Sequence, residues 1–196
     1  MSEEKAYSDL PKAPETPYHF IKSIFAYKNS LVISLIWNIK YKKSAKAVEI
    51  GGYALYRHIC ENWYLHLDEI ILLPIPISHR RRNERGYNQC ELLLNQVKKL
   101  DKTQNLTFSY NLIKRKIHKD RQTLKNRSMR LEDAKNIFEI DFAELEKLQG
   151  ATKEVDKQVK IIIIDDVVTT GSTMREAVEL IRSVGFKDVS GVSLAH

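Results

Sequence analysis

Two adjacent acids, Asp165 and Asp166, follow four consecutive isoleucines and precede a small, hydroxyl-rich turn. The whole segment, residues 161–173, reads Ile-Ile-Ile-Ile-Asp-Asp-Val-Val-Thr-Thr-Gly-Ser-Thr. Carboxylates accept hydrogen bonds from sugar hydroxyls and bind Mg²⁺ through oxygen. A turn that offers backbone N–H groups and hydroxyls at the start of a helix binds a phosphate group without a lysine. The segment therefore predicts a sugar-phosphate site, with the turn on the phosphate and the acids on the ribose hydroxyls.

The order of strand, turn and helix is typical of a buried parallel strand in an α/β sheet. Ligands of such sheets bind at the carboxyl ends of the strands, where the acids and the turn would lie. Gly171 allows the backbone to approach a ligand closely. Ser172 or Thr173 is expected to cap a helix that runs from Met174 to Ser183.

Two other interpretations of this segment compete with a sugar-phosphate site. In the first, the strand leads into a capped helix, and the acids are solvated and bind nothing. In the second, the apolar run ending in two acids is a Walker B strand, which needs a G-x-x-x-x-G-K-[ST] partner. The sequence contains no such segment, and Gly51-Gly52 lies in a helical pattern with no lysine after it. We therefore reject a nucleoside triphosphatase.

Residues 161–173 resemble the motif with which type I phosphoribosyltransferases bind 5-phosphoribosyl-1-pyrophosphate (PRPP). The resemblance implies the α/β fold of that family, with a central, mostly parallel sheet flanked by helices and an N-terminal helical hood. It also implies PRPP or a related ribose 5-phosphate ligand, bound together with Mg²⁺. The residues that it assigns to this ligand are Asp165, Asp166, Val168, Thr169, Thr170, Gly171, Ser172 and Thr173. Among them, Asp165 and Asp166 are the catalytic candidates and the candidates for a contact to Mg²⁺.

A second segment, residues 70–91, contains an apolar strand, Pro74 and Pro76, a basic loop, and Arg-Gly-Tyr-Asn-Gln at the start of a helix. This order resembles the ComF family of competence proteins, as do Phe25-Ala26-Tyr27, Leu35-Ile36 and Lys40-Tyr41. Guanidinium groups bind pyrophosphate in a bidentate manner. The pyrophosphate candidates are Arg80, Arg82, Arg85 and Asn88. For the arginines at positions 80–82, the alternative is a solvated basic loop.

A third segment, residues 114–125, is strongly basic and has no apolar period, which favours a loop. In the resemblance, it corresponds to a mobile loop that covers PRPP and excludes water. Its candidate residues are Arg115, His118, Arg121 and Gln122. With Lys125, Arg127 and Arg130 it could instead follow the phosphates of single-stranded DNA. A charged surface with no ligand is the remaining alternative.

The chain departs from the ComF pattern in its cysteines. Typical members begin with a cysteine-rich zinc module, whereas this sequence has only Cys60 and Cys90, too few for a four-cysteine site. We therefore expect no zinc. Residues 1–17 carry three prolines among charged residues and are expected to form a flexible leader. Residues 18–66 would then form the helical hood and residues 67–196 the phosphoribosyltransferase-like core.

The composition indicates a single soluble domain: 196 residues, 43% hydrophobic and 29% charged, with a net charge of +7 that favours anionic partners. No signal peptide is visible, and the apolar stretch at residues 31–39 is too short to span a membrane. We expect a cytoplasmic protein with no membrane insertion. The ComF resemblance implies single-stranded DNA as a partner, together with competence or recombination proteins, during natural transformation. The alternative is a catalytically active phosphoribosyltransferase of nucleotide salvage.

The apolar periods and turn signals predict the elements that position these residues. Helices are expected at residues 30–40, 44–66, 87–100, 128–134 and 174–183. Strands are expected at residues 70–75, 107–113, 137–142, 159–164 and 189–194, and a polar surface turn at 144–157. Trp37, Trp63, His58 and His66 are expected to pack in the interior.

Overall fold

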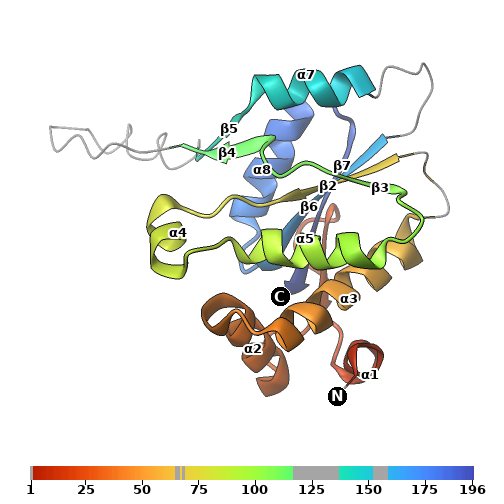
Figure 1. The fold of residues 1–196 in the computed structure, drawn as a ribbon, viewed down its shortest axis with the longest axis vertical. Coiled ribbons are helices and arrows are strands. Elements are labelled where there is room, and N and C mark those ends of the chain that lie inside the picture. Colours follow the sequence, from red (N-terminus) through yellow and green to blue (C-terminus); the bar gives the residue numbers. More distant parts are fainter. Residues whose placement is uncertain (1, 65–66, 68, 117–136, 152–158) are drawn as a thin grey trace, which may run out of the picture.

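The computed structural model describes residues 2–64, 67, 69–116, 137–151 and 159–196. Five parallel strands form the central sheet in the order β1-β7-β6-β2-β3 (Figure 1). Their bounds are β1 Ile21–Phe25, β2 Glu69–Pro74, β3 Leu106–Phe108, β6 Val159–Val167 and β7 Asp188–Ala195. Strands of a parallel sheet are buried on both faces, which is why Ile161–Ile164 can be uninterrupted isoleucine. The predicted mostly parallel sheet flanked by helices is confirmed.

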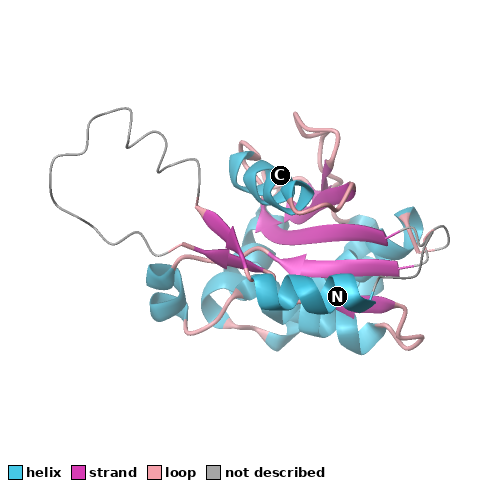
Figure 2. Ribbon diagram, turned by 90° about the horizontal axis from the view of Figure 1, so that it is seen from above, coloured by secondary structure: helices cyan, strands magenta, loops and turns pink. Residues whose placement is uncertain are grey.

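Alternate side chains of β6 enter two different hydrophobic cores. Ile162 and Ile164 pack in the core that lies against helices α1, α2, α3 and α5. Ile161 and Ile163 pack in the core beneath α7, α8 and the small antiparallel pair β4–β5 (Figures 1 and 2). The bounds are α1 Glu3–Asp9, α2 Ser30–Trp37, α3 Ala45–Asn62, α5 Gln89–Leu100, β4 Ile113–Arg115, β5 Phe138–Ile140, α7 Phe142–Ala151 and α8 Ser172–Ser183.

Helices α3 and α5 approach each other closely through two glycines. A Cβ atom on Gly52 would lie 2.5 Å from Cβ of Gln96, and one on Gly51 would lie 2.8 Å from Cδ2 of Leu93. Larger residues would not fit between the helices, which explains Gly51 and Gly52 despite their cost of roughly 1 kcal/mol each in a helix interior. This close packing holds α5, whose first turn borders the site, against the N-terminal part of the chain.

The N-terminal part differs from the prediction. Within the expected flexible leader, residues 3–9 form α1, because Ala6 and Leu10 give it an apolar side that is buried against the first core. Within the expected helical hood, residues 21–25 form the edge strand β1 beside β7. The helix expected at residues 30–40 divides into α2 and a five-residue π-helix, η1 (Asn38–Lys42).

Other elements also differ. The expected basic loop after β2 is a short helix, α4 (His79–Arg85), whose N-terminus is capped by the Ser78 side chain. The polar segment expected to be a surface turn begins with α7, because Leu145 and Leu148 face the second core. The single strand expected at residues 107–113 is two strands, β3 and β4. The helix expected at residues 128–134 lies outside the described residues.

One of the residues expected in the interior is on the surface. The Trp37 side chain, at the end of α2, is 48% exposed, so its prediction as a core residue was wrong. Trp63 is half-buried against the first core, as is the His58 ring that it contacts edge-on. Among the residues that the structure describes, no helix is long and apolar enough to cross a membrane.

Candidate functional site

The site lies at the carboxyl ends of β2 and β6, where these parallel strands lead into α4 and α8. A cleft of about 680 Å³ opens there. Its lining includes Tyr27, Lys40, Tyr41, residues 75–78, Arg80, Arg81, Arg85, Gln89, Arg115 and residues 165–174. The two acids and the hydroxyl-rich turn thus share one cavity with cations that come from α4, β4 and η1.

The turn after β6 presents the N-terminus of α8 to this cleft. Gly171 is the N-cap residue, with φ of 77°, and has no side chain to cap the helix, although the Thr170 hydroxyl accepts a hydrogen bond from the Ser172 N–H at 3.5 Å. The prediction that Ser172 or Thr173 caps α8 was therefore wrong. The Ser172 hydroxyl lies 3.1 Å from the Thr170 hydroxyl, and both side chains are exposed. Residues 171–174, at the N-terminus of the helix, line the cavity, and the positive end of the helix dipole there is suited to a phosphate group.

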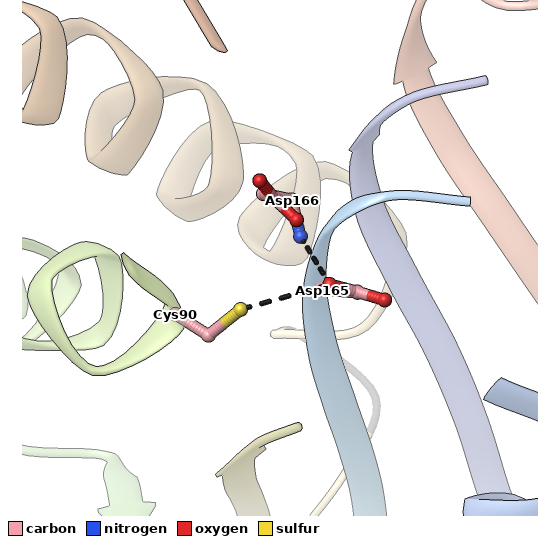
Figure 3. Close-up of side chains that lie close together, drawn as sticks. All are labelled: Cys90, Asp165 and Asp166. Carbon is pink, nitrogen blue, oxygen red and sulfur yellow. Dashed lines mark hydrogen bonds between the residues drawn. The ribbon is translucent and has the colours of Figure 1, made fainter. Parts of the chain in front are cut away.

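The side chains of Asp165 and Asp166 leave β6 in different directions (Figure 3). Oδ1 of Asp165 accepts a hydrogen bond from the backbone N–H of Asp166 at 2.8 Å, and the Cys90 thiol lies 3.8 Å from the same oxygen. Burial, followed by the charge of Asp166, raises the pKa of Asp165 well above its ordinary value. Burial likewise raises the pKa of the Cys90 thiol, so that the thiol stays protonated at neutral pH.

Asp166 is the centre of a polar network that links three elements. Its Oδ1 accepts a hydrogen bond from the side-chain amide of Gln89 at 3.4 Å, and its Oδ2 lies 2.9 Å from Nζ of Lys40. Gln89 in turn accepts a hydrogen bond from the guanidinium of Arg85 at 3.1 Å. The network thereby connects η1, the start of α5 and the end of α4 to the carboxyl end of β6.

The predicted pyrophosphate residues separate into two groups. Arg80 and Arg85 line the cleft, together with Arg81 of the same basic segment. Arg82 instead pairs with Glu91 at 2.7 Å, away from the lining. The buried Asn88 side chain donates to the Ile75 carbonyl and caps α5 at Cys90. The structure therefore does not bring Arg82 and Asn88 to the cleft.

Of the mobile-loop candidates, Arg115 lies on β4 and lines the cleft, with its guanidinium 5.6 Å from the centre of the Phe138 ring. His118, Arg121 and Gln122 lie outside the described residues. Lys40 and Gln89 are site residues that the sequence reasoning did not assign. Both belong to segments that carried the ComF resemblance, Lys40-Tyr41 and Arg-Gly-Tyr-Asn-Gln, and this was the signal that could have identified them.

Cys90, Asp165 and Asp166 bring potential ligand atoms within 4.8 Å of one another. A thiol is a soft ligand, whereas carboxyl groups offer the oxygen atoms that a hard cation such as Mg²⁺ prefers, and binding of the cation would favour the charged form of Asp165. The donor set therefore fits Mg²⁺ through Asp165 and Asp166 alone.

Comparison with known proteins agrees with this geometry. A model of the phosphoribosyl transferase domain family matches residues 91–195, more than half of the chain, and the chain belongs to that family. It is also similar to Competence protein F of Haemophilus influenzae, with 32% identity over 132 residues, which are 67% of this chain and 52% of that protein. These findings confirm the resemblance to type I phosphoribosyltransferases and to ComF. The chain spans about half the length of this curated relative.

Proposed function

We propose that the chain binds PRPP, or a related ribose 5-phosphate ligand, in this cleft together with Mg²⁺. The observation that carries the proposal is the N-terminus of α8, which begins at a left-handed glycine and lies beside Asp165 and Asp166 in a cavity lined by arginines. A helix N-terminus binds a phosphate group, carboxylates accept hydrogen bonds from ribose hydroxyls, and arginines bind pyrophosphate.

In this arrangement, residues 169–173 hold the 5-phosphate through backbone N–H groups and hydroxyls. Asp165 and Asp166 accept hydrogen bonds from the ribose hydroxyls. Arg80, Arg81 and Arg85 contact the pyrophosphate. Asp165 and Asp166 would also hold Mg²⁺, which would supply positive charge to neutralise the pyrophosphate.

The test is a calorimetric titration of PRPP and Mg²⁺ into the wild type and into Asp165→Asn/Asp166→Asn, which keeps the size of both side chains. We expect binding to the wild type and a loss of at least about tenfold in the double variant, the effect of one charge-assisted hydrogen bond or more. Asp188→Asn is the matched control, because Asp188 pairs with Lys160 at the other end of the sheet. Equal affinity in the wild type and the double variant would contradict the proposed site.

We further propose that the chain acts on single-stranded DNA during natural transformation. The similarity to a protein named Competence protein F and the net charge of +7 support this role. So do Trp37 and Tyr41, which are exposed neighbours with ring centres 5.9 Å apart and cations from Lys42 and Arg85 above them. Exposed aromatic rings beside cations are the usual platform for unpaired bases.

Fluorescence anisotropy of a labelled oligo-dT at several salt concentrations tests this second role. We expect an affinity that falls steeply with salt and that weakens in Trp37→Ala, whereas Trp63→Phe behaves as the wild type. Absence of binding at low salt would exclude the DNA role. Release of pyrophosphate from PRPP on addition of a nucleobase would instead place the chain among the active salvage transferases.

A further inference from the structure

The Lys40 side chain forms an ion pair with Asp166, one of the two acids proposed to bind the ligand. Its Nζ lies 2.9 Å from Oδ2 of Asp166, and the two side chains are 21% and 5% exposed, respectively. The lysine is carried by η1, and its side chain lines the cleft next to Tyr41. The contact joins the N-terminal part of the chain directly to the end of β6.

The charges around Asp166 restrict which ligand groups can take the place of the Lys40 ammonium beside it. Asp165 and Asp166 are adjacent, and Asp166 is almost fully buried. Withdrawing the ammonium would leave a buried carboxylate beside a second acid without compensation, which is strongly unfavourable. Ribose hydroxyls donate hydrogen bonds to the carboxylate but bring no positive charge. A divalent cation brings the charge and accepts carboxylate oxygens as ligands.

Resting on the proposed function, we propose that Lys40 is a specificity-determining residue: it competes with a divalent cation for Asp166 and restricts the cleft to phosphorylated ribose ligands that arrive with a metal. The lysine thus acts as the resident counter-ion of the acid pair. A ligand that brings its own cation can displace the lysine, and a metal-free ligand cannot.

The experiment measures Mn²⁺ alone, with free Mn²⁺ followed by electron paramagnetic resonance. The wild type is compared with Lys40→Met, Lys40→Arg and Lys42→Met. Lys42 lies two residues away on η1, and its ammonium is 5.4 Å from the centre of the Trp37 ring, outside the cleft lining. We expect Lys40→Met to bind Mn²⁺ about fivefold more tightly than the wild type, because the variant no longer has the ion pair that competes for Asp166. Lys40→Arg and Lys42→Met should bind as the wild type does.

Three results would overturn the role of Lys40. The first is equal Mn²⁺ affinity in the wild type and Lys40→Met. The second is an equal gain in Lys42→Met, because net charge alone would then explain the effect. The third is the absence of Mn²⁺ binding from every variant. If Lys40→Met fails to fold by circular dichroism, Lys40→Gln keeps a hydrogen-bond donor without the charge and is measured in its place.

Failure of this inference is distinguishable from failure of the proposed function. The Lys40 comparison uses the metal alone, whereas the proposed function is tested by calorimetry with PRPP. PRPP binding to the wild type with no effect of Lys40→Met on Mn²⁺ would remove only the role of Lys40. A Lys40 effect on Mn²⁺ without PRPP binding would leave a metal-binding acid pair and remove the PRPP assignment.

Discussion

The ring of Tyr18 lies against Gly171 so closely that a Cβ atom on the glycine would be 2.9 Å from ring atoms Cδ2 and Cε2. Gly171 also has φ of 77°, a backbone conformation that residues other than glycine rarely adopt. Two independent constraints therefore hold a glycine at the start of α8. The segment before β1, which carries Tyr18, in this way packs against the turn that is proposed to bind phosphate.

This packing predicts the effect of Gly171→Ala. The variant should lose PRPP binding and should also lose more stability than Gly86→Ala, as measured by urea denaturation. Gly86 has the same φ of 77°, but among the described residues no atom lies within 4 Å of an added Cβ, so its substitution should show only the backbone cost of about 1–2 kcal/mol. Equal losses of stability in the two variants would show that the Tyr18 contact is not restrictive.

Two arginines of α4 should differ in their effect on the ligand. Arg85 lines the cleft and is held by Gln89, whereas Arg82 pairs with Glu91 outside the lining. We expect Arg85→Met to weaken PRPP binding about tenfold or more, because it removes a cation that is proposed to contact pyrophosphate. Arg82→Met, the same change on the same helix, should bind nearly as the wild type does. Calorimetry that finds the larger loss in Arg82→Met would reverse the assignment.

The pKa of Asp165 predicts how stability depends on pH. Burial and Asp166 raise this pKa in the folded state above the ordinary value of 3.8. Between the two values, the folded protein binds more protons than the unfolded chain, so the unfolding free energy falls as pH rises through this window. Asp165→Asn has no carboxyl to titrate, and its stability relative to the wild type should increase with pH. Urea denaturation at several pH values measures this, with Asp188→Asn as the control. A constant difference across the series would exclude the effect.

His58 should contribute a pH dependence of the opposite sign. Burial lowers the pKa of His58 from 6.5 to about 4, since the ring is packed against Trp63. Between these values, the unfolded chain binds the extra proton, and the unfolding free energy therefore falls as pH decreases through this window. His58→Phe keeps an aromatic ring and should lack this contribution, whereas His79→Gln, at an exposed position on α4, should retain it. Thermal unfolding at a series of pH values below about 7 distinguishes the two variants.

The sequence was sufficient to predict those strands and helices whose formation depends on neighbouring residues. A buried parallel strand must be apolar on both faces, so Ile161–Ile164 identified β6, and the turn after it identified the start of α8. Residues 70–75 identified β2 for the same reason. The arginines after β2, which the sequence suggested as pyrophosphate ligands, reach the same cleft as Asp165 and Asp166 because parallel strands end at the same edge of a sheet.

The sequence was insufficient where burial or pairing depends on distant residues. Helix α1 is stabilised because Ala6 and Leu10 pack in the first core. Strand β1 forms because it pairs with the edge of β7. Trp37 lies on the surface because the buried side of α2 is formed by Val32, Leu35 and Ile36. The partners of α1 and β1 are distant in sequence, and the sequence of α2 does not show which of its sides the core covers, so composition favoured a flexible leader and a buried tryptophan.

The candidate site shows the same division. The sequence by itself determined the types of its groups, namely two acids, a glycine-containing turn and arginines, because each lies within a short motif. Only the tertiary structure decided which members reach the cleft. It directs Arg82 to Glu91 and Asn88 to the Ile75 carbonyl, and it brings Lys40 to Asp166, which lies 126 positions further along the chain. Side-chain direction on a helix and contact between distant elements are set by packing, which no local motif encodes.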